Sequence, residues 1–132
     1  MLQRDYFIRV LQEFTAALTR FLEKNEGEDK KDKDLIDLWR QYVGDYDTLR
    51  NLSFEELIKF SNEQWKKDER VDRLEMTAEL LYAEASYKEK PLRDILLDKS
   101  FKVFDYVDAN SSTFSIDRKT KMEQIRTLLG NI

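Results

Sequence analysis

The chain has 132 residues, of which 41% are hydrophobic and 38% are charged, and it contains neither Cys nor His. This length suits one domain that can bury a core without disulfides. The missing residue types exclude disulfides, thiolate nucleophiles, zinc sites built from Cys or His, and imidazole acid–base chemistry. A net charge of −4 disfavours nucleic acid and anionic membranes as partners.

The first segment, residues 1–24, predicts an amphipathic helix from about residue 3. Its apolar side chains recur at alternating steps of four and three, which places on one helix face Phe7, Leu11, Phe14, Leu18 and Phe21. Charged residues interrupt the segment every few positions, so we expect no secretory signal, no membrane span and a cytoplasmic location. A broad aromatic face is costly to leave in water, so we expect it to contact the rest of the chain or another chain.

Residues 25–33 contain no apolar side chain. Nothing in this segment offsets the entropy lost on ordering, so it is predicted to be a flexible linker. A calcium loop is disfavoured, because the Gly and the closing Glu are not at the required positions. The remainder of the chain, residues 34–132, is predicted to form a helical domain.

That domain is predicted to begin with a short helix over residues 35–43 and a loop over residues 45–51. Ser53 is followed three residues later by Glu56, which is the pattern of a capping box. A helix is therefore expected to begin after Ser53. It either continues past residue 68 or breaks near Asp68, and the break is favoured because Asp68 could cap a new helix.

The hairpin over residues 70–109 is predicted to hold two helices, residues 70–88 and 92–109, joined by a short connection that makes them antiparallel. Each helix is apolar on two faces, so each should pack between neighbours. One stripe of the second helix includes Ile95. The second stripes of the two helices include Met76, Tyr87, Leu97 and Phe101.

A last helix is predicted over residues 116–129, ended by Gly130, with inward-facing side chains at Met122, Ile125, Leu128 and Leu129. No segment has the alternation expected of a strand. The sequence therefore predicts an all-α fold of five to six helices with antiparallel helical hairpins.

Two stretches of the hairpin, Leu80–Tyr87 and Asp98–Tyr106, together resemble a degenerate tetratricopeptide unit. The helix over 116–129 stands where a capping third helix would follow such a unit. This resemblance implies a tetratricopeptide-like arrangement in the C-terminal part.

Both ends of the chain also resemble a group of small uncharacterised bacterial helical proteins. The residues that carry this resemblance are Gln3, Arg4, Asp5, Tyr6, Arg9 and Phe14, together with Ser115–Arg118 and Lys121. The resemblance implies no activity, because none is assigned to that group.

Four carboxylates, Asp68, Asp72, Glu75 and Glu79, step along one side of the helix that begins near residue 70. Such a row could present oxygens to a hard cation or activate a water molecule. Cations interleave with the row, which is also typical of a solvated and mutually compensated helix face.

Cations gather on the last helix at Arg118, Lys119, Lys121 and Arg126. A nucleic-acid interface needs a larger surplus of positive charge on one face. These side chains are instead predicted to favour the negative C-terminal end of their helix.

We therefore expect a non-enzymatic protein–protein interaction or scaffold module whose partner is another protein or a second copy, with self-association through the N-terminal helix. The interface candidates are Phe7, Leu11, Phe14, Leu18, Phe21, Met76, Tyr87, Leu97 and Phe101. No catalytic residue, cofactor, metal, small molecule, nucleic acid or membrane partner is expected. The alternative is a metal-dependent enzyme that uses the carboxylates between Asp68 and Glu79.

Overall fold

The computed structural model describes residues 2–130, and the side chains of residues 6–130. Within this part of the chain all regular structure is helical, which confirms the all-α prediction. The described helices number seven, so the predicted five to six is too low: α1 (Leu2–Glu23), α2 (Glu28–Tyr42), α3 (Tyr46–Leu49), α4 (Phe54–Gln64), α5 (Arg70–Ala85), α6 (Leu92–Asn110) and α7 (Ile116–Leu129).

The chain divides into two compact units, Met1–Asn51 and Leu52–Ile132. The boundary therefore lies after Asn51, whereas the sequence predicted a domain that begins at residue 34. The difference arises because α2 packs with α1 and α3 within the first unit.

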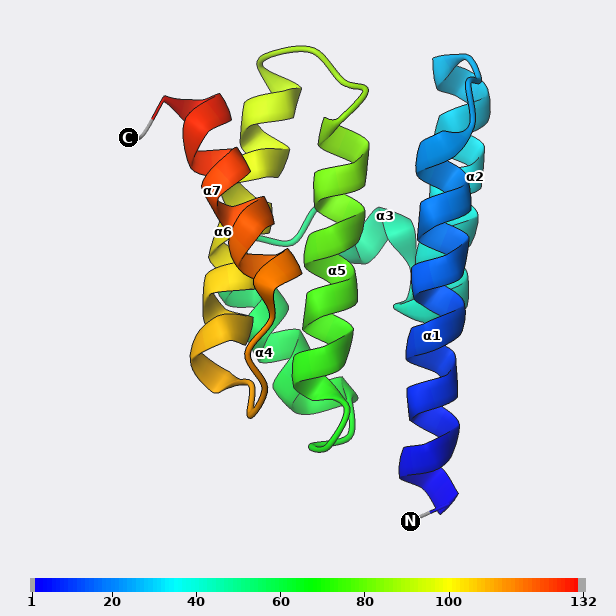
Figure 1. Ribbon diagram of the computed structural model, residues 1–132, viewed down its shortest axis with the longest axis vertical. Coiled ribbons are helices and arrows are strands. Elements are labelled where there is room, and N and C mark those ends of the chain that lie inside the picture. The colour runs from blue at the N-terminus through cyan, green and yellow to red at the C-terminus, as the bar shows by residue number, and fades with distance from the viewer. Residues whose placement is uncertain (1, 131–132) are drawn as a thin grey trace. The chain divides into compact units, whose positions relative to one another are not determined.

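In the first unit, α1 and α2 form an antiparallel hairpin (Figure 1). Phe14 of α1 meets Tyr42 of α2 edge to face, with ring centroids 5.3 Å apart. At the other end of the hairpin, the Lys31 ammonium lies 4.9 Å from the centroid of the Phe21 ring. The predicted apolar face of the first helix is therefore packed against the helix that follows it.

The predicted flexible linker over residues 25–33 is wrong over most of its length, because α2 begins at Glu28. This stretch lacks apolar side chains, but its charges are placed to stabilise a helix. Glu28 and Asp29 lie in the first turn, where acidic groups interact favourably with the helix dipole. Lys30 forms an ion pair with Asp34 one turn later, at 3.4 Å.

The loop predicted over residues 45–51 contains α3. The Asp45 carboxylate caps this short helix by accepting from the Thr48 backbone N–H at 3.0 Å and from the Thr48 hydroxyl at 2.8 Å. An Asx cap of this kind is difficult to separate from an ordinary turn in a sequence, because the same residue types favour both.

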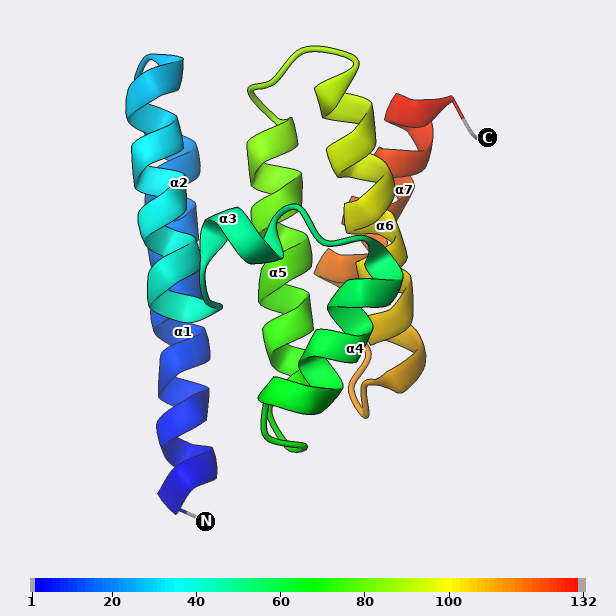
Figure 2. The ribbon, with the colours of Figure 1, turned by 180° about the vertical axis from the view of Figure 1, so that it is seen from behind.

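In the second unit, α5 and α6 form an antiparallel hairpin, and α4 and α7 lie on opposite faces of it (Figures 1 and 2). The Ser100 hydroxyl of α6 donates to the Ala78 carbonyl of α5 at 2.8 Å. On the α4 side, Tyr106 of α6 meets Phe54 edge to face at 6.2 Å. As predicted, α6 packs between neighbours, and these are α5, α7 and α4.

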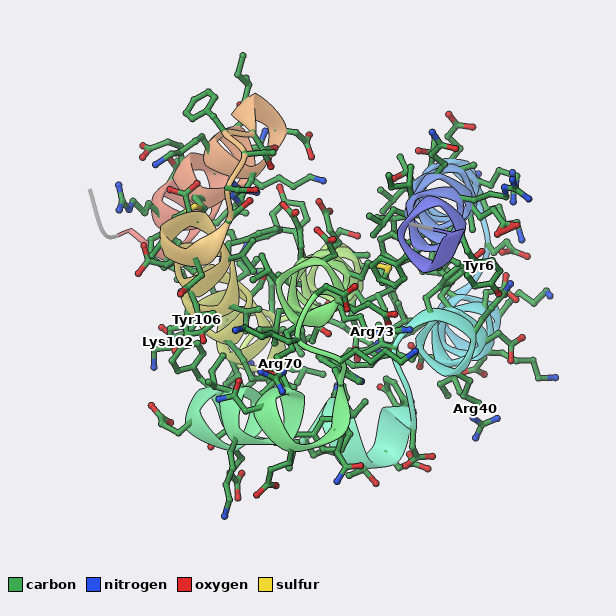
Figure 3. The ribbon with its side chains drawn as sticks, turned by 90° about the horizontal axis from the view of Figure 1, so that it is seen from below. Tyr6, Arg40, Arg70, Arg73, Lys102 and Tyr106 are labelled. Carbon is green, nitrogen blue, oxygen red and sulfur yellow. The ribbon has the colours of Figure 1, made fainter. Side chains whose placement is uncertain are left out.

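The ends of the helices in this unit follow local chemistry. The capping box before α4 is confirmed: the Glu56 N–H donates to the Ser53 hydroxyl at 3.1 Å, and the Ser53 N–H donates to the Glu56 carboxylate at 2.8 Å. The predicted break near Asp68 is also present, although Glu69 and not Asp68 precedes α5. Arg70, labelled in Figure 3, reaches from α5 to the Asn62 carbonyl of α4 at 2.9 Å.

Two residues predicted to face inward are exposed. Ile95 of α6 has 60% of its surface exposed and Leu128 of α7 has 45%. Both lie at the edge of an apolar stripe, where a small rotation of the helix decides which side the residue faces. Among the described residues, no helix has both the length and the apolar character needed to cross a bilayer.

Candidate functional site

None of the nine interface candidates is exposed. Three are half-buried, namely Leu11, Tyr87 and Phe101. The other six are buried, namely Phe7, Phe14, Leu18, Phe21, Met76 and Leu97. These side chains therefore do not form an open apolar surface in this structure.

A buried arginine joins the last helix to the α5–α6 hairpin. The Arg118 guanidinium donates to Glu75 of α5 at 2.9 Å, to Asp108 of α6 at 3.0 Å and to the Thr113 carbonyl at 3.0 Å. Only 2% of the Arg118 side chain is exposed. Two carboxylates and one carbonyl therefore satisfy a cation that would be costly to bury alone.

The electrostatics of this cluster favour the ionised forms. Burial lowers the pKa of Arg118, but the hydrogen bonds and charges of Glu75 and Asp108 outweigh it, and the pKa lies above its ordinary value. Hydrogen bonds from Lys119 and then Arg118 hold the pKa of Asp108 below its ordinary value. The Lys119 ammonium lies 2.6 Å from the second oxygen of Asp108.

A second ion pair lies one turn further along α7. The Lys121 ammonium lies 2.5 Å from Glu79 of α5 and 3.1 Å from Asp117. Burial raises the pKa of Glu79 despite the opposing charge of Lys121. Burial also lowers the pKa of Lys121, but the charge of Glu79 outweighs this effect and the pKa lies above its usual range.

The row of carboxylates predicted on α5 is thus divided among cations. Glu75 and Glu79 each bind a cation of α7. Within α5 and the residue before it, Arg73 forms an ion pair with Glu69 one turn earlier, at 2.9 Å. In the part of the chain that the structure describes, no group of three or more acidic residues could hold a metal ion.

The cations of α7 do not act as the sequence predicted. Arg118 is the third residue of the helix, so it lies in the first turn, where the helix dipole disfavours a positive charge. Lys121 is directed at α5 and not at the end of its own helix. Only Arg126 lies in the last turn, where it packs over the Phe101 ring at 5.0 Å from the centroid.

The outer side of α7 borders a shallow, open hollow of about 650 Å³. Tyr82 of α5 forms one edge of it, and its hydroxyl lies 2.5 Å from the Gln124 side-chain oxygen. We define the α7 face as the residues of that helix that line this hollow together with the exposed Ile116: Ile116, Lys119, Thr120, Glu123, Gln124, Thr127 and Leu128.

A smaller hollow of about 150 Å³ adjoins the C-terminal end of α7 and is lined by Tyr82, Ala85, Ser86, Arg93, Leu97 and Leu128. Tyr82 and Leu128 line both hollows. The partly exposed Leu128 therefore faces the end of the α5–α6 hairpin as well as the larger hollow.

Asp108, Tyr82 and Gln124 were not predicted from the sequence as members of a site. The sequence did contain one relevant pattern of spacing. The carboxylates of Glu75 and Glu79 are one helical turn apart, and the cations of Arg118 and Lys121 are nearly one turn apart. Two helices that pack side by side can join such matched pairs. That inference needs the packing of α7 to be known.

No protein-family model, no curated protein and no solved structure matches this chain.

Proposed function

We propose that this chain is a non-enzymatic protein–protein interaction or scaffold module, and that the α7 face is its docking surface. The observation that carries this proposal is that the two sides of α7 differ in their contacts. Its inner side is occupied by internal ion pairs, while its outer side is exposed and borders an open hollow.

The chemistry of the charged groups supports recognition rather than catalysis. A general acid or base must reach a substrate with a free proton site. Glu75, Glu79 and Asp108 instead accept hydrogen bonds from cations of the same unit. Their role is to hold α7 in place.

The composition of the α7 face supports a protein partner. Ile116 is 72% exposed and Leu128 is 45% exposed, and Thr and Gln side chains lie between them. Apolar anchors surrounded by polar groups that can form hydrogen bonds are typical of protein interfaces. The resemblance of the α5–α6 hairpin to a tetratricopeptide unit agrees with such a role.

The first unit is a weaker candidate for docking. Phe14 and Phe21 already pack against α2, so self-association through the N-terminal helix would require that contact to be exchanged. We therefore place the surface on α7.

A photo-crosslinking experiment tests this proposal. The photoreactive residue benzoylphenylalanine is placed at the exposed Thr127 of the full chain, and in a control at the exposed Lys59 of α4. We expect a defined protein to be crosslinked from Thr127 and not from Lys59. That protein, once purified, should bind the full chain, and Leu128→Glu should weaken the binding at least tenfold while Lys59→Glu leaves it unchanged.

The proposal fails if Thr127 and Lys59 crosslink the same proteins, or none. It also fails if the purified binding protein is insensitive to Leu128→Glu. Thermal unfolding of both variants confirms that the substitutions at these exposed positions leave the fold intact.

A further inference from the structure

We propose that the smaller hollow, at the C-terminal end of α7, binds a short-chain monocarboxylate. Its carboxylate pairs with the Arg93 guanidinium, and its alkyl chain lies among apolar side chains of three helices. This site goes beyond the proposed docking surface, because its occupant is a small molecule and its polar contact is a residue of α6 that the docking surface does not include.

The hollow lies where three helices of the second unit end or begin (Figure 1). α5 ends at Ala85, α6 begins at Leu92 and α7 ends at Leu129. Each of the three helices supplies part of the lining. The volume of about 150 Å³ is well below the roughly 300–1,000 Å³ of pockets for drug-sized ligands, so the hollow suits a smaller molecule.

The walls of the hollow are largely apolar. Ala85 and Leu97 are each 2% exposed, and Leu128 faces them from α7. An alkyl chain that enters the hollow loses its contact with water against these side chains. Each methylene group buried in this way should raise the affinity about fourfold.

Arg93 is the one charged side chain among the six that line the hollow. Its Nε donates to the Asp94 carboxylate at 3.0 Å, and its Nη2 donates to the Leu128 carbonyl at 3.3 Å. No residue that the structure describes accepts a hydrogen bond from Nη1. The Arg93 side chain is only 25% exposed, so this donor lies partly withdrawn from water.

The two terminal nitrogens of a guanidinium form one edge, which binds a carboxylate through two parallel hydrogen bonds. Asp94 does not occupy this edge, because it binds Nε. Asp94 also lies 3.8 Å from the Lys90 ammonium, so it does not depend on Arg93 alone for its positive partner. A ligand carboxylate can therefore take the free edge of Arg93 while the Asp94 contact is retained.

The helix dipoles around the hollow oppose one another. Arg93 is the second residue of α6, and the N-terminal end of a helix favours an anion. The C-terminal ends of α5 and α7 have the reverse effect. The guanidinium is consequently the group that selects a negative charge, and a single cation beside an apolar wall matches a ligand with one carboxylate and an alkyl chain.

NMR titration of the ¹⁵N-labelled full chain with hexanoate, at constant ionic strength, tests the site. We expect saturable shifts at the amides of Ala85, Leu97 and Leu128, with a dissociation constant of about 1 mM. Butyrate, which has two fewer methylene groups, should bind about 15-fold more weakly. 1-Hexanol, which has the same chain length and no charge, should bind at least tenfold more weakly than hexanoate.

Arg93→Gln removes the charge and keeps a hydrogen-bonding side chain. It should weaken hexanoate binding at least tenfold and leave 1-hexanol binding unchanged, which also shows that the hollow is still folded. Arg93→Lys keeps the charge and should retain part of the hexanoate affinity. Arg126→Gln is the matched control, because Arg126 is an arginine of the adjacent α7 that does not line the hollow, and it should leave hexanoate binding unchanged.

The site is refuted if hexanoate causes no saturable shift at these amides up to about 50 mM, a concentration far above the expected dissociation constant. It is also refuted if 1-hexanol binds as tightly as hexanoate, or if Arg93→Gln and Arg126→Gln have the same effect. None of these measurements involves a partner protein. Their failure therefore leaves the proposed docking surface to be decided by crosslinking from Thr127.

Discussion

Replacing Arg118 by Met should destabilise the second unit more than any other single loss of charge on α7. The substitution removes three hydrogen bonds from a side chain that is 2% exposed, and it leaves Glu75 and Asp108 without their shared cation. Removing one partner of a buried ion pair costs about 3–5 kcal/mol. Both carboxylates retain some contact with water, so we expect the lower end of that range, about 3 kcal/mol.

The measurement is urea denaturation of the full chain, followed by the fluorescence of its two tryptophans. Trp39 lies in the first unit and Trp65 in the second, so Trp39→Phe and Trp65→Phe backgrounds each report one unit. The loss should appear in the transition reported by Trp65.

Arg126→Met is the matched control, because Arg126 is a half-exposed arginine of the same helix with an exposed partner. It should cost less than about 1 kcal/mol. The reasoning is refuted if Arg118→Met costs no more than Arg126→Met. It is also refuted if neutralising both carboxylates, by Glu75→Gln and Asp108→Asn in the Arg118→Met background, recovers none of the lost stability.

Three further changes test other parts of the structure. Lys121→Met leaves Glu79 buried without its main cation, so the pKa of Glu79 should rise further. A carboxyl group whose pKa is raised by folding loses its stabilising effect as the pH rises through that pKa, so urea denaturation should show a larger loss at pH 7 than at pH 4. Ser53→Ala removes the cap of α4 and should cost about 1 kcal/mol by the Trp65 transition; an unchanged midpoint would contradict the role of the cap. Gly130→Ala places a side chain at a φ of 77° and should cost about 1 kcal/mol and reduce helicity at the end of α7 by circular dichroism.

The predictions from the sequence were most accurate in segments where apolar periodicity and helix-capping residues indicate the same helix bounds. The helices of the α5–α6 hairpin begin at the predicted residues, and the bounds of α7 match the prediction at both ends. Two apolar stripes on α6 correctly predicted that this helix packs between neighbours, and α4 contacts it in addition to α5 and α7. Ser100 bonds to α5 on one side, and Phe101 lies under Arg126 of α7 on the other.

The start of α2 was missed because the prediction weighed only apolar burial. The segment before Asp34 has no side chain to bury, yet charged residues have good intrinsic helix propensity and can stabilise one another one turn apart. Lys30 and Lys24 both reach Asp34, at 3.4 Å each, so this carboxylate joins α2 to the end of α1. Charge spacing can therefore extend a helix beyond its apolar stripe.

The site on α7 could not be predicted from the sequence for a related reason. The matched spacing of the two carboxylates and the two cations does not show which helices pack together, and Glu75 and Arg118 are 43 residues apart. The unfavourable place of Arg118 in the first turn was the clue that it required a partner elsewhere.

That mode of attachment also explains the outer side of the helix. Because directed ion pairs hold α7 to the hairpin, only Met122 and Ile125 among its apolar side chains are fully buried. Ile116 and Leu128 keep 72% and 45% of their surface exposed. Under the proposed function, the exposed parts of these two side chains are the apolar anchors of the docking surface.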